Sequence, residues 1–271
     1  MYLEKAKQLL NDEYQKRYRE NSSGFRLEVM DEKIMHSYQV LGAGNFILKH
    51  EPCFASCSHE EIDKLQAMVL LHDVARFYEI LMIGQGKSLD HGVYGAKMLS
   101  ETADFSSKDI TIPIRHHGHL IEELYADEEY KNLSVLEQKL IERNSFLVRD
   151  ADKLANFYLL VRNFDEYGPM FLVSSEYKDP YNKNISERVN KDFFAHKCVT
   201  RGDVCNLADK ALCLWSWFYD VNYDSSFLFI QRLHILKRFF ACLSKYWKEE
   251  EAKSYWLEME KFMKSRHKKS S

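Results

Sequence analysis

Glycine and proline are scarce in this chain, at ten and four residues among 271. A sheet of many strands needs a turn after each strand, and these two residues supply many such turns. Apolar residues instead recur at helical spacing, for example at Ile62, Leu65, Met68 and Val69. The sequence therefore predicts an all-α fold.

Long apolar runs and paired cysteines are also missing. No apolar stretch approaches the roughly 18 residues that a membrane span needs, and the amphipathic N-terminus has no signal-peptide core. The six cysteines form no CxxC pair, which is typical of reduced thiols in a protein without a secretory signal. We therefore expect a cytoplasmic protein that has no membrane partner.

No charge of one sign dominates the sequence. Lysine and arginine number 38 and aspartate and glutamate 41, which leaves a formal net charge of −3. Proteins that bind duplex nucleic acid carry a basic excess or a basic patch. We therefore expect no duplex nucleic acid as a partner, while an oligomer is compatible with the sequence.

Helix start signals divide the chain into elements. Ser58 and Ser134 each precede a glutamate by three residues, which is the capping-box pattern, and they predict helices over about 59–82 and 134–163. Further N-caps are expected at Asp31, at Asp90 and within the segment 106–109.

The stretch 165–195 is polar and contains two of the four prolines, so we expect it to be irregular. Apolar helical periodicity returns over 203–221 and 226–247. We divide the chain into a helical core, 1–164, the irregular excursion, and C-terminal helices, 196–271, that belong to the same globular unit.

Five short strings each offer a side chain that binds divalent metals. They are His36 in MHSYQV, His72 and Asp73 in LLHDVARF, His91 in DHGVYGAKML, His117 in IRHHGH, and Asp152 in RDADKLANF. Helical spacing places most of them on apolar, inward faces, and a carboxylate buried without a partner or a cation costs several kcal/mol. A shared metal centre explains the pattern, and a buried hydrogen-bonded network is the alternative.

In order and spacing, these strings closely resemble the HD superfamily of metal-dependent phosphohydrolases. The likeness is strongest to an uncharacterised bacterial branch with strings such as LHDIGRF, DHAELG, IRYHN and RDADKLD. The motifs span 36–157, and FYDVNYDSSF at 218–227 also resembles that branch. The resemblance implies an HD-domain helical bundle with additional C-terminal helices packed on it.

The resemblance also implies which residues hold metal. One ion is expected on His36, His72, Asp73 and Asp152, and a second on His91 and His117 with Asp73 as the bridge. Asp152 is favoured over Asp150, because the family's last Asp precedes a basic residue and a leucine. Aligning IRHHGH with IRYHN favours His117 over His116.

The expected chemistry follows from the donor types. Two divalent ions about 3.5–4 Å apart lower the pKa of a bridging water and bind phosphoryl oxygens, so we expect Asp73, His91 and His117 to be catalytic. Mn, Fe, Co, Ni, Zn and Mg all remain candidates. The groups expected to bind the substrate phosphate are Arg76, Arg115, His116 and Lys153.

We therefore expect hydrolysis of a small phosphorylated molecule, such as a nucleotide or a related phosphoester. The stringent-response branch carries HDxxED, and here the residues after the His-Asp pair are VARF, which argues against that activity. Some HD proteins with six such ligands are di-iron oxygenases, and others are binding or sensing modules. Both remain alternatives to hydrolysis.

Overall fold

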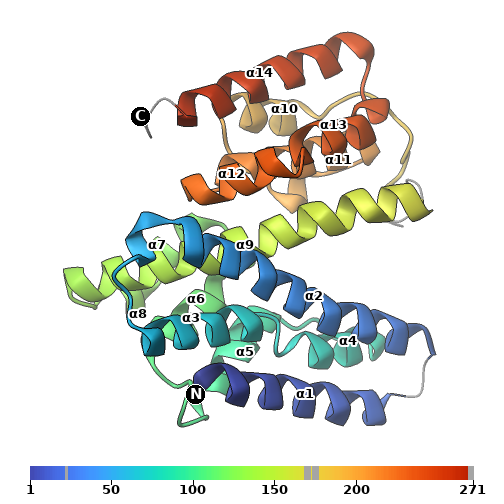
Figure 1. Cartoon of the computed structure of the whole chain (residues 1–271). Helices are drawn as coiled ribbons and strands as arrows, with labels where there is room; N and C mark the ends of the chain where they lie inside the picture. The colour runs from blue at the N-terminus through green and yellow to red at the C-terminus, as the bar shows by residue number, and fades with distance from the viewer. Residues whose placement is uncertain (22–23, 168–171, 173–176, 268–271) are drawn as a thin grey trace. The chain divides into compact units, whose positions relative to one another are not determined.

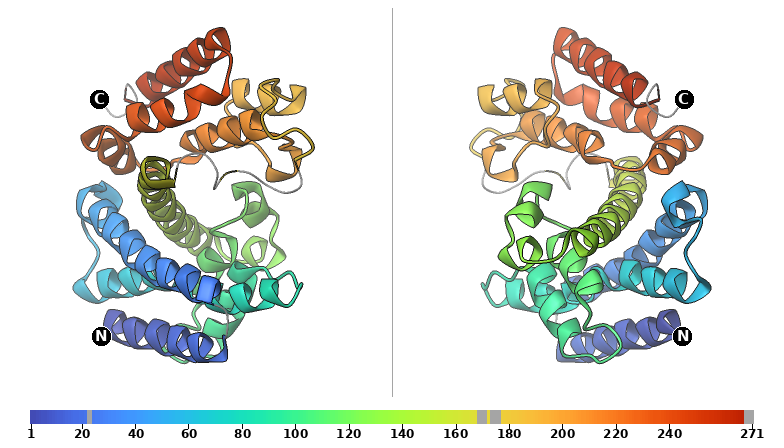
Figure 2. Two further views of the ribbon diagram at one scale, coloured as in Figure 1. Left: turned by 90° about the vertical axis from the view of Figure 1, so that its right-hand side faces the viewer. Right: turned by 90° about the vertical axis from the view of Figure 1, so that its left-hand side faces the viewer.

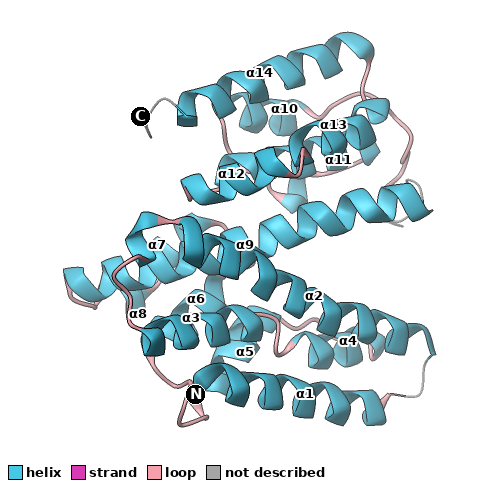
Figure 3. Cartoon of the chain, in the orientation of Figure 1, coloured by secondary structure: helices cyan, strands magenta, loops and turns pink. Residues whose placement is uncertain are grey.

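The computed structural model of the protein describes residues 1–21, 24–167, 172 and 177–267. None of these residues forms a strand, which confirms the all-α prediction (Figure 3). No helix of the described part is long and apolar enough to cross a membrane. The chain divides into two compact units, Met1–Ala155 and Asn156–Ser271. The single globular unit proposed above stays a prediction.

The first unit is a bundle of helices (Figure 1). Its elements are α1 (Tyr2–Glu20), α2 (Gly24–His50), α3 (His59–Leu71), α4 (Arg76–Gly84), α5 (His91–Ser100), α6 (Lys108–His116), α7 (Ile121–Ala126), α8 (Glu128–Lys131) and the larger part of α9 (Val135–Tyr167). Helix α3 packs against both α1 and α2, and α5 packs against α6. Both views in Figure 2 show α1, in dark blue, at the edge of this unit.

The predicted helix over 59–82 is wrong in one respect, because it is interrupted at its centre. Helix α3 ends at Leu71, α4 begins at Arg76, and a turn joins them with bonds from the Val74 N–H to the Leu71 carbonyl and from the Arg76 N–H to the Asp73 carbonyl. In a continuous helix neighbouring side chains point about 100° apart. His72 keeps helical backbone angles, so the interruption begins after it. The apolar spacing continues through the turn and gives no sign of the break.

Most of the predicted caps are present. The Glu61 N–H donates to Ser58 Oγ at 3.1 Å, the Val93 N–H donates to Asp90 Oδ1 at 3.0 Å, and the capping box at Ser134 forms. Asp31 is not a cap, because α2 begins at Gly24 and passes through it.

The second unit contains α10 (Glu187–Phe194), α11 (Leu207–Ser216), α12 (Asp224–Arg232), α13 (Ile235–Leu243) and α14 (Glu249–His267). Three aromatic rings form the centre of its core. The Phe157 ring stacks on Phe218 with centroids 4.3 Å apart and meets Phe239 edge-on at 5.3 Å.

The expected irregular stretch 165–195 is partly helical, so that prediction needs correction. Helix α9 continues to Tyr167, and α10 lies at the far end of the stretch. Val189 and Phe193 stand four residues apart and are both fully buried, which stabilises a helix despite the polar residues around them. The residues 168–171 and 173–176 lie outside the described part.

The two C-terminal helices expected over 203–221 and 226–247 are each divided. The first consists of α11 and a 3-10 turn, Trp217–Asp220. The second is split at His234, whose φ of 52° is in the left-handed region and ends α12 before α13 begins.

Candidate metal centre

All six predicted ligands lie in the first unit, on different elements. His36 is within α2, His72 and Asp73 are in the turn between α3 and α4, His91 is the first residue of α5, His117 directly follows α6, and Asp152 is within α9. Most of them stand at helix ends or in a turn. At these positions one helix ends or another begins, and side chains from separate helices can converge.

The first group consists of His36, His72 and Asp73. All three are buried, and one potential ligand atom of each lies within 4.8 Å of the others. Asp152 Oδ1 lies 2.9 Å from His36 Nε2 and 3.6 Å from His72 Nε2. The structure therefore places Asp152, which the sequence analysis favoured over Asp150, close to both histidines.

The second group consists of Asp73, His91 and His117. Asp73 Oδ1 lies 3.2 Å from His91 Nε2 and 3.4 Å from His117 Nε2, and the two histidine Nε2 atoms are 3.3 Å apart. Asp73 thus belongs to both groups. One carboxylate is therefore common to the two groups of histidines.

The donor set passes a test for metal that does not depend on the motifs. His72 Nδ1 donates to the Val69 carbonyl at 2.9 Å, and His117 Nδ1 donates to the Ile114 carbonyl at 2.7 Å. These bonds leave a lone pair on each Nε2, the atom turned toward the cluster. His72 Nε2 and Asp73 Oδ1 are buried and have no hydrogen-bond partner. Buried acceptors that face one another need a cation, so these residues fit a divalent metal.

Both carboxylates of the cluster are held in the ionised form. Burial by itself would raise the pKa of Asp73, but Arg76 and the surrounding histidines bring it well below its usual range. Burial opposes ionisation of Asp152 too, and the hydrogen bond with His36 and the proximity of His72 lower its pKa well below the ordinary value. The cluster therefore offers two negative charges to a cation.

Glu79 on α4 is a functional residue that the sequence reasoning missed. Its Oε1 lies 3.4 Å from His91 Nδ1, and its Oε2 accepts from Arg76 Nη1 at 2.5 Å. Burial would lower the pKa of His91, but the nearby carboxylates of Asp73 and Glu79 raise it to about 9. Glu79 thus orients the ring so that Nε2 faces Asp73. The sequence feature that could have identified Glu79 is its position three residues after Arg76, on the same helix face.

Two of the cations expected at the substrate are engaged elsewhere. Arg115 pairs with Asp127 at 3.0 Å and with Glu129 at 2.9 Å, and His116 Nε2 lies 2.7 Å from Asp127. These carboxylates occupy the donor groups that were expected to bind phosphate. The ion pairs favour a role for Arg115 and His116 in joining α6 to the α7–α8 segment.

Arg149 on α9 is a second residue that the sequence reasoning missed. Its side chain is buried, and Nη1 donates to the carbonyls of His116, His117 and His119 at 3.0, 3.4 and 2.5 Å. A cation at this helix end satisfies carbonyls that have no partner within the helix. Arg149 therefore supports the backbone that carries His117. It lies three residues before Asp152, on a neighbouring part of the same helix face.

Gly92 allows α5 and α6 to approach each other next to the cluster. A Cβ atom at Gly92 would lie 2.7 Å from the Arg115 carbonyl oxygen, which belongs to the backbone. We expect Gly92→Ala to lower the free energy of unfolding by about 1–3 kcal/mol, because the helices must separate. The displacement would also move His91 away from His117. Chemical denaturation and metal content measure the two effects.

Gly95→Ala is the matched control, on the same helix. A Cβ there would meet its nearest neighbours at 3.5 Å or more, which is ordinary contact. This variant is expected to keep its metal and to be at least as stable as the wild type, since alanine favours helix over glycine. Equal stability and metal content in the two variants would contradict the close approach.

The comparisons agree with this geometry. Residues 34–156 match the family model of the HD domain, a segment that contains all six expected ligands. Residues 34–156 are thus an HD domain, the domain of a superfamily of metal-dependent phosphohydrolases. Residues 215–269 match a model described as nitrogen fixation protein NifW. No curated protein and no solved structure matches the chain.

Proposed function

We propose that the protein is a metal-dependent phosphohydrolase that acts on a small phosphorylated molecule, such as a nucleotide or a related phosphoester. The observation that carries the proposal is the position of Asp73, whose carboxylate belongs to both histidine groups. A centre for two ions needs such a shared ligand, and two-ion centres are common in enzymes that hydrolyse phosphate esters.

Each residue has a definite part in this proposal. His36, His72 and Asp152 would hold one ion, His91 and His117 a second, and Asp73 would contact both. Divalent ions held there would lower the pKa of bound water and polarise phosphoryl oxygens. An imidazole that ligates a metal ion is neutral, so two divalent ions with two carboxylates and four such imidazoles would leave the centre with net positive charge, which attracts an anionic phosphate.

Arg76 is the proposed phosphate-orienting residue. Its side chain is 25% exposed, and its Nε lies 3.3 Å from Asp73 Oδ2. Nε and Nη1 are used in ion pairs with Asp73 and Glu79, and Nη2 makes no further bond to the described residues. A guanidinium fixed along one edge can present its other edge to a phosphate oxygen. Lys153, half-buried and next to Asp152, is a second candidate.

Metal content tests the two-ion arrangement directly. Protein purified without chelator is expected to contain about two divalent ions per chain by elemental analysis. His117→Ala is expected to contain about one, because it removes a ligand of the second group and leaves His36, His72 and Asp152 in place. His59→Ala is the control, since His59 is exposed at the start of α3. Two ions retained in His117→Ala, or none in the wild type, would contradict the arrangement.

A phosphate-release screen then tests the reaction. Enzyme loaded with manganese, cobalt, nickel or iron is incubated with nucleotides, dinucleoside polyphosphates, cyclic nucleotides and sugar phosphates, and liberated phosphate is measured. Release that requires both Asp73 and metal supports hydrolysis. Substrate-dependent oxygen uptake by the iron form would instead assign an oxygenase, and a metal-loaded protein that turns over no compound would point to a sensing module.

A further inference from the structure

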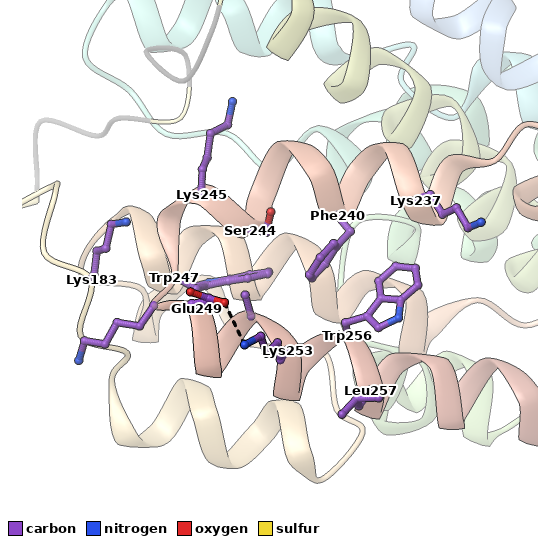
Figure 4. A pocket seen from close by; sticks show the side chains of 12 residues that line it. Lys183, Lys237, Phe240, Ser244, Lys245, Trp247, Glu249, Lys253, Trp256 and Leu257 are labelled. Carbon is purple, nitrogen blue, oxygen red and sulfur yellow. Dashed lines mark ion pairs between the residues drawn. The ribbon is translucent and has the colours of Figure 1, made fainter.

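A pocket of about 980 Å³ lies entirely within the second unit. The residues around it come from α13, from α14, from the 3-10 turn between these helices, and from Lys183 ahead of α10 (Figure 4). Small-molecule sites typically enclose about 300–1,000 Å³. The volume is therefore large enough for a ligand with several ring systems or charged groups.

Aromatic side chains form the base of this pocket. The rings of Phe240 and Trp256 lie 4.9 Å apart, and each is only partly buried, so both offer ring surface to the pocket. Trp247 lines it as well, and its Nε1 donates to the Ala208 carbonyl at 3.0 Å, which fixes the indole. Leu257 adds a side chain that is 55% exposed. A rigid, partly open aromatic surface suits a planar ligand.

Lysines surround that base. Five of them line the pocket, in a chain whose net charge is −3. Glu249 also lines it, but its carboxylate is paired with Lys253 at 2.9 Å. Among the described residues, Lys183, Lys237 and Lys245 form no ion pair, and Lys245 Nζ lies 5.6 Å from the centre of the Phe164 ring. Their charges are therefore available to an anion, and their accumulation here creates a local positive potential.

We propose that this pocket binds a nucleoside phosphate. Figure 4 shows Lys183 and Lys245 on its left and Lys237 on its right, on both sides of the aromatic side chains. A nucleoside phosphate combines the two matching parts, an aromatic base for the ring surface and negative charge for the lysines. Base–aromatic stacking contributes about 1–3 kcal/mol, and the lysines act as point charges for the phosphates. The site uses no residue of the metal centre.

Tryptophan fluorescence provides a selective measurement, because all four tryptophans lie in the second unit. The full-length protein is titrated with ATP and with GTP in the presence of EDTA, which prevents phosphate binding through metal ions. We expect saturable quenching by at least one nucleotide. Failure of the phosphohydrolase proposal would leave this result unchanged, because the metal centre plays no part in it.

Variants connect the quenching to the pocket. Lys245→Glu is expected to weaken binding about tenfold or more, because an attractive charge becomes repulsive at the phosphates, and tenfold corresponds to about 1.4 kcal/mol. Trp256→Leu is expected to weaken binding by a similar factor through lost stacking. Lys191→Glu is the control, since it makes the same charge change at an exposed position of α10 outside the pocket. Circular dichroism confirms that each variant is folded.

Several outcomes would overturn the proposal. One is the absence of saturable quenching by either nucleotide, and another is equal affinity of Lys245→Glu and Lys191→Glu. Tripolyphosphate that binds as tightly as ATP would show that the base makes no contact. Binding to phosphatidylglycerol vesicles without any response to nucleotides would assign the lysines to a lipid surface instead.

Discussion

Asp73→Asn is expected to remove nearly all bound divalent metal and to lower phosphate release about a thousandfold or more. The carboxylate belongs to both groups of ligands, with Oδ1 3.2 Å from His91 Nε2 and 3.4 Å from His117 Nε2. Asparagine keeps the shape but loses the negative charge and turns a donor toward one ligand position. Metal ions supply several kcal/mol of transition-state stabilisation in such enzymes, and each 1.36 kcal/mol is a factor of ten.

Elemental analysis and phosphate release check this expectation together, with circular dichroism to confirm folding. Asp12→Asn is the matched control, because it makes the same chemical change at an exposed site on α1. The control should keep full metal content and activity. If Asp73→Asn retained two ions and most of its activity, Asp73 would not be the shared ligand and the two-ion model would fail.

Arg149→Met is expected to lower the free energy of unfolding by about 3–5 kcal/mol. Methionine fills much of the same volume, but it removes the donor of the His117 and His119 carbonyls, while the His116 carbonyl keeps its bond from the His119 N–H. Each buried polar group that loses its partner costs about 1–3 kcal/mol. Because His117 lies on this backbone segment, metal content should fall as well. Chemical denaturation measures the stability, and elemental analysis measures the metal.

Arg19→Met is the control for this prediction, because Arg19 is exposed near the end of α1. Substitution there is expected to change stability by no more than about 0.5 kcal/mol. If the two variants had the same stability, the bonds from Arg149 to the α6 terminus would contribute nothing measurable. If Arg149→Met lost stability but kept its metal, Arg149 would stabilise the packing of α9 without positioning His117.

Helix starts were predictable from local sequence, but the break between two helices was not. Ser58, Asp90 and Ser134 predicted real helix starts, because an N-cap depends only on residues within one turn of it. The break between α3 and α4 was not predictable in this way. Its apolar periodicity is the same as that of one long helix, and the turn at His72 and Asp73 is visible only when neighbouring helices are in place.

The cluster was likewise predictable in part. The order of the histidine and aspartate strings named six side chains, and the structure brings these six together from five separate segments of the chain. The supporting residues Glu79 and Arg149 were not named. An arginine or a glutamate on a helix has no local mark that shows which distant histidine it contacts, so only the tertiary structure identifies it.

By itself, the sequence determined the helical class and the donor chemistry of this protein, because both follow from residue type and short-range spacing. The tertiary structure set the distances that place Asp73 against both histidine groups, and it engaged Arg115 and His116 with Asp127. It also revealed the lysine-lined aromatic pocket. These features depend on distances between residues far apart in the chain, and such distances are set by the packing of helices.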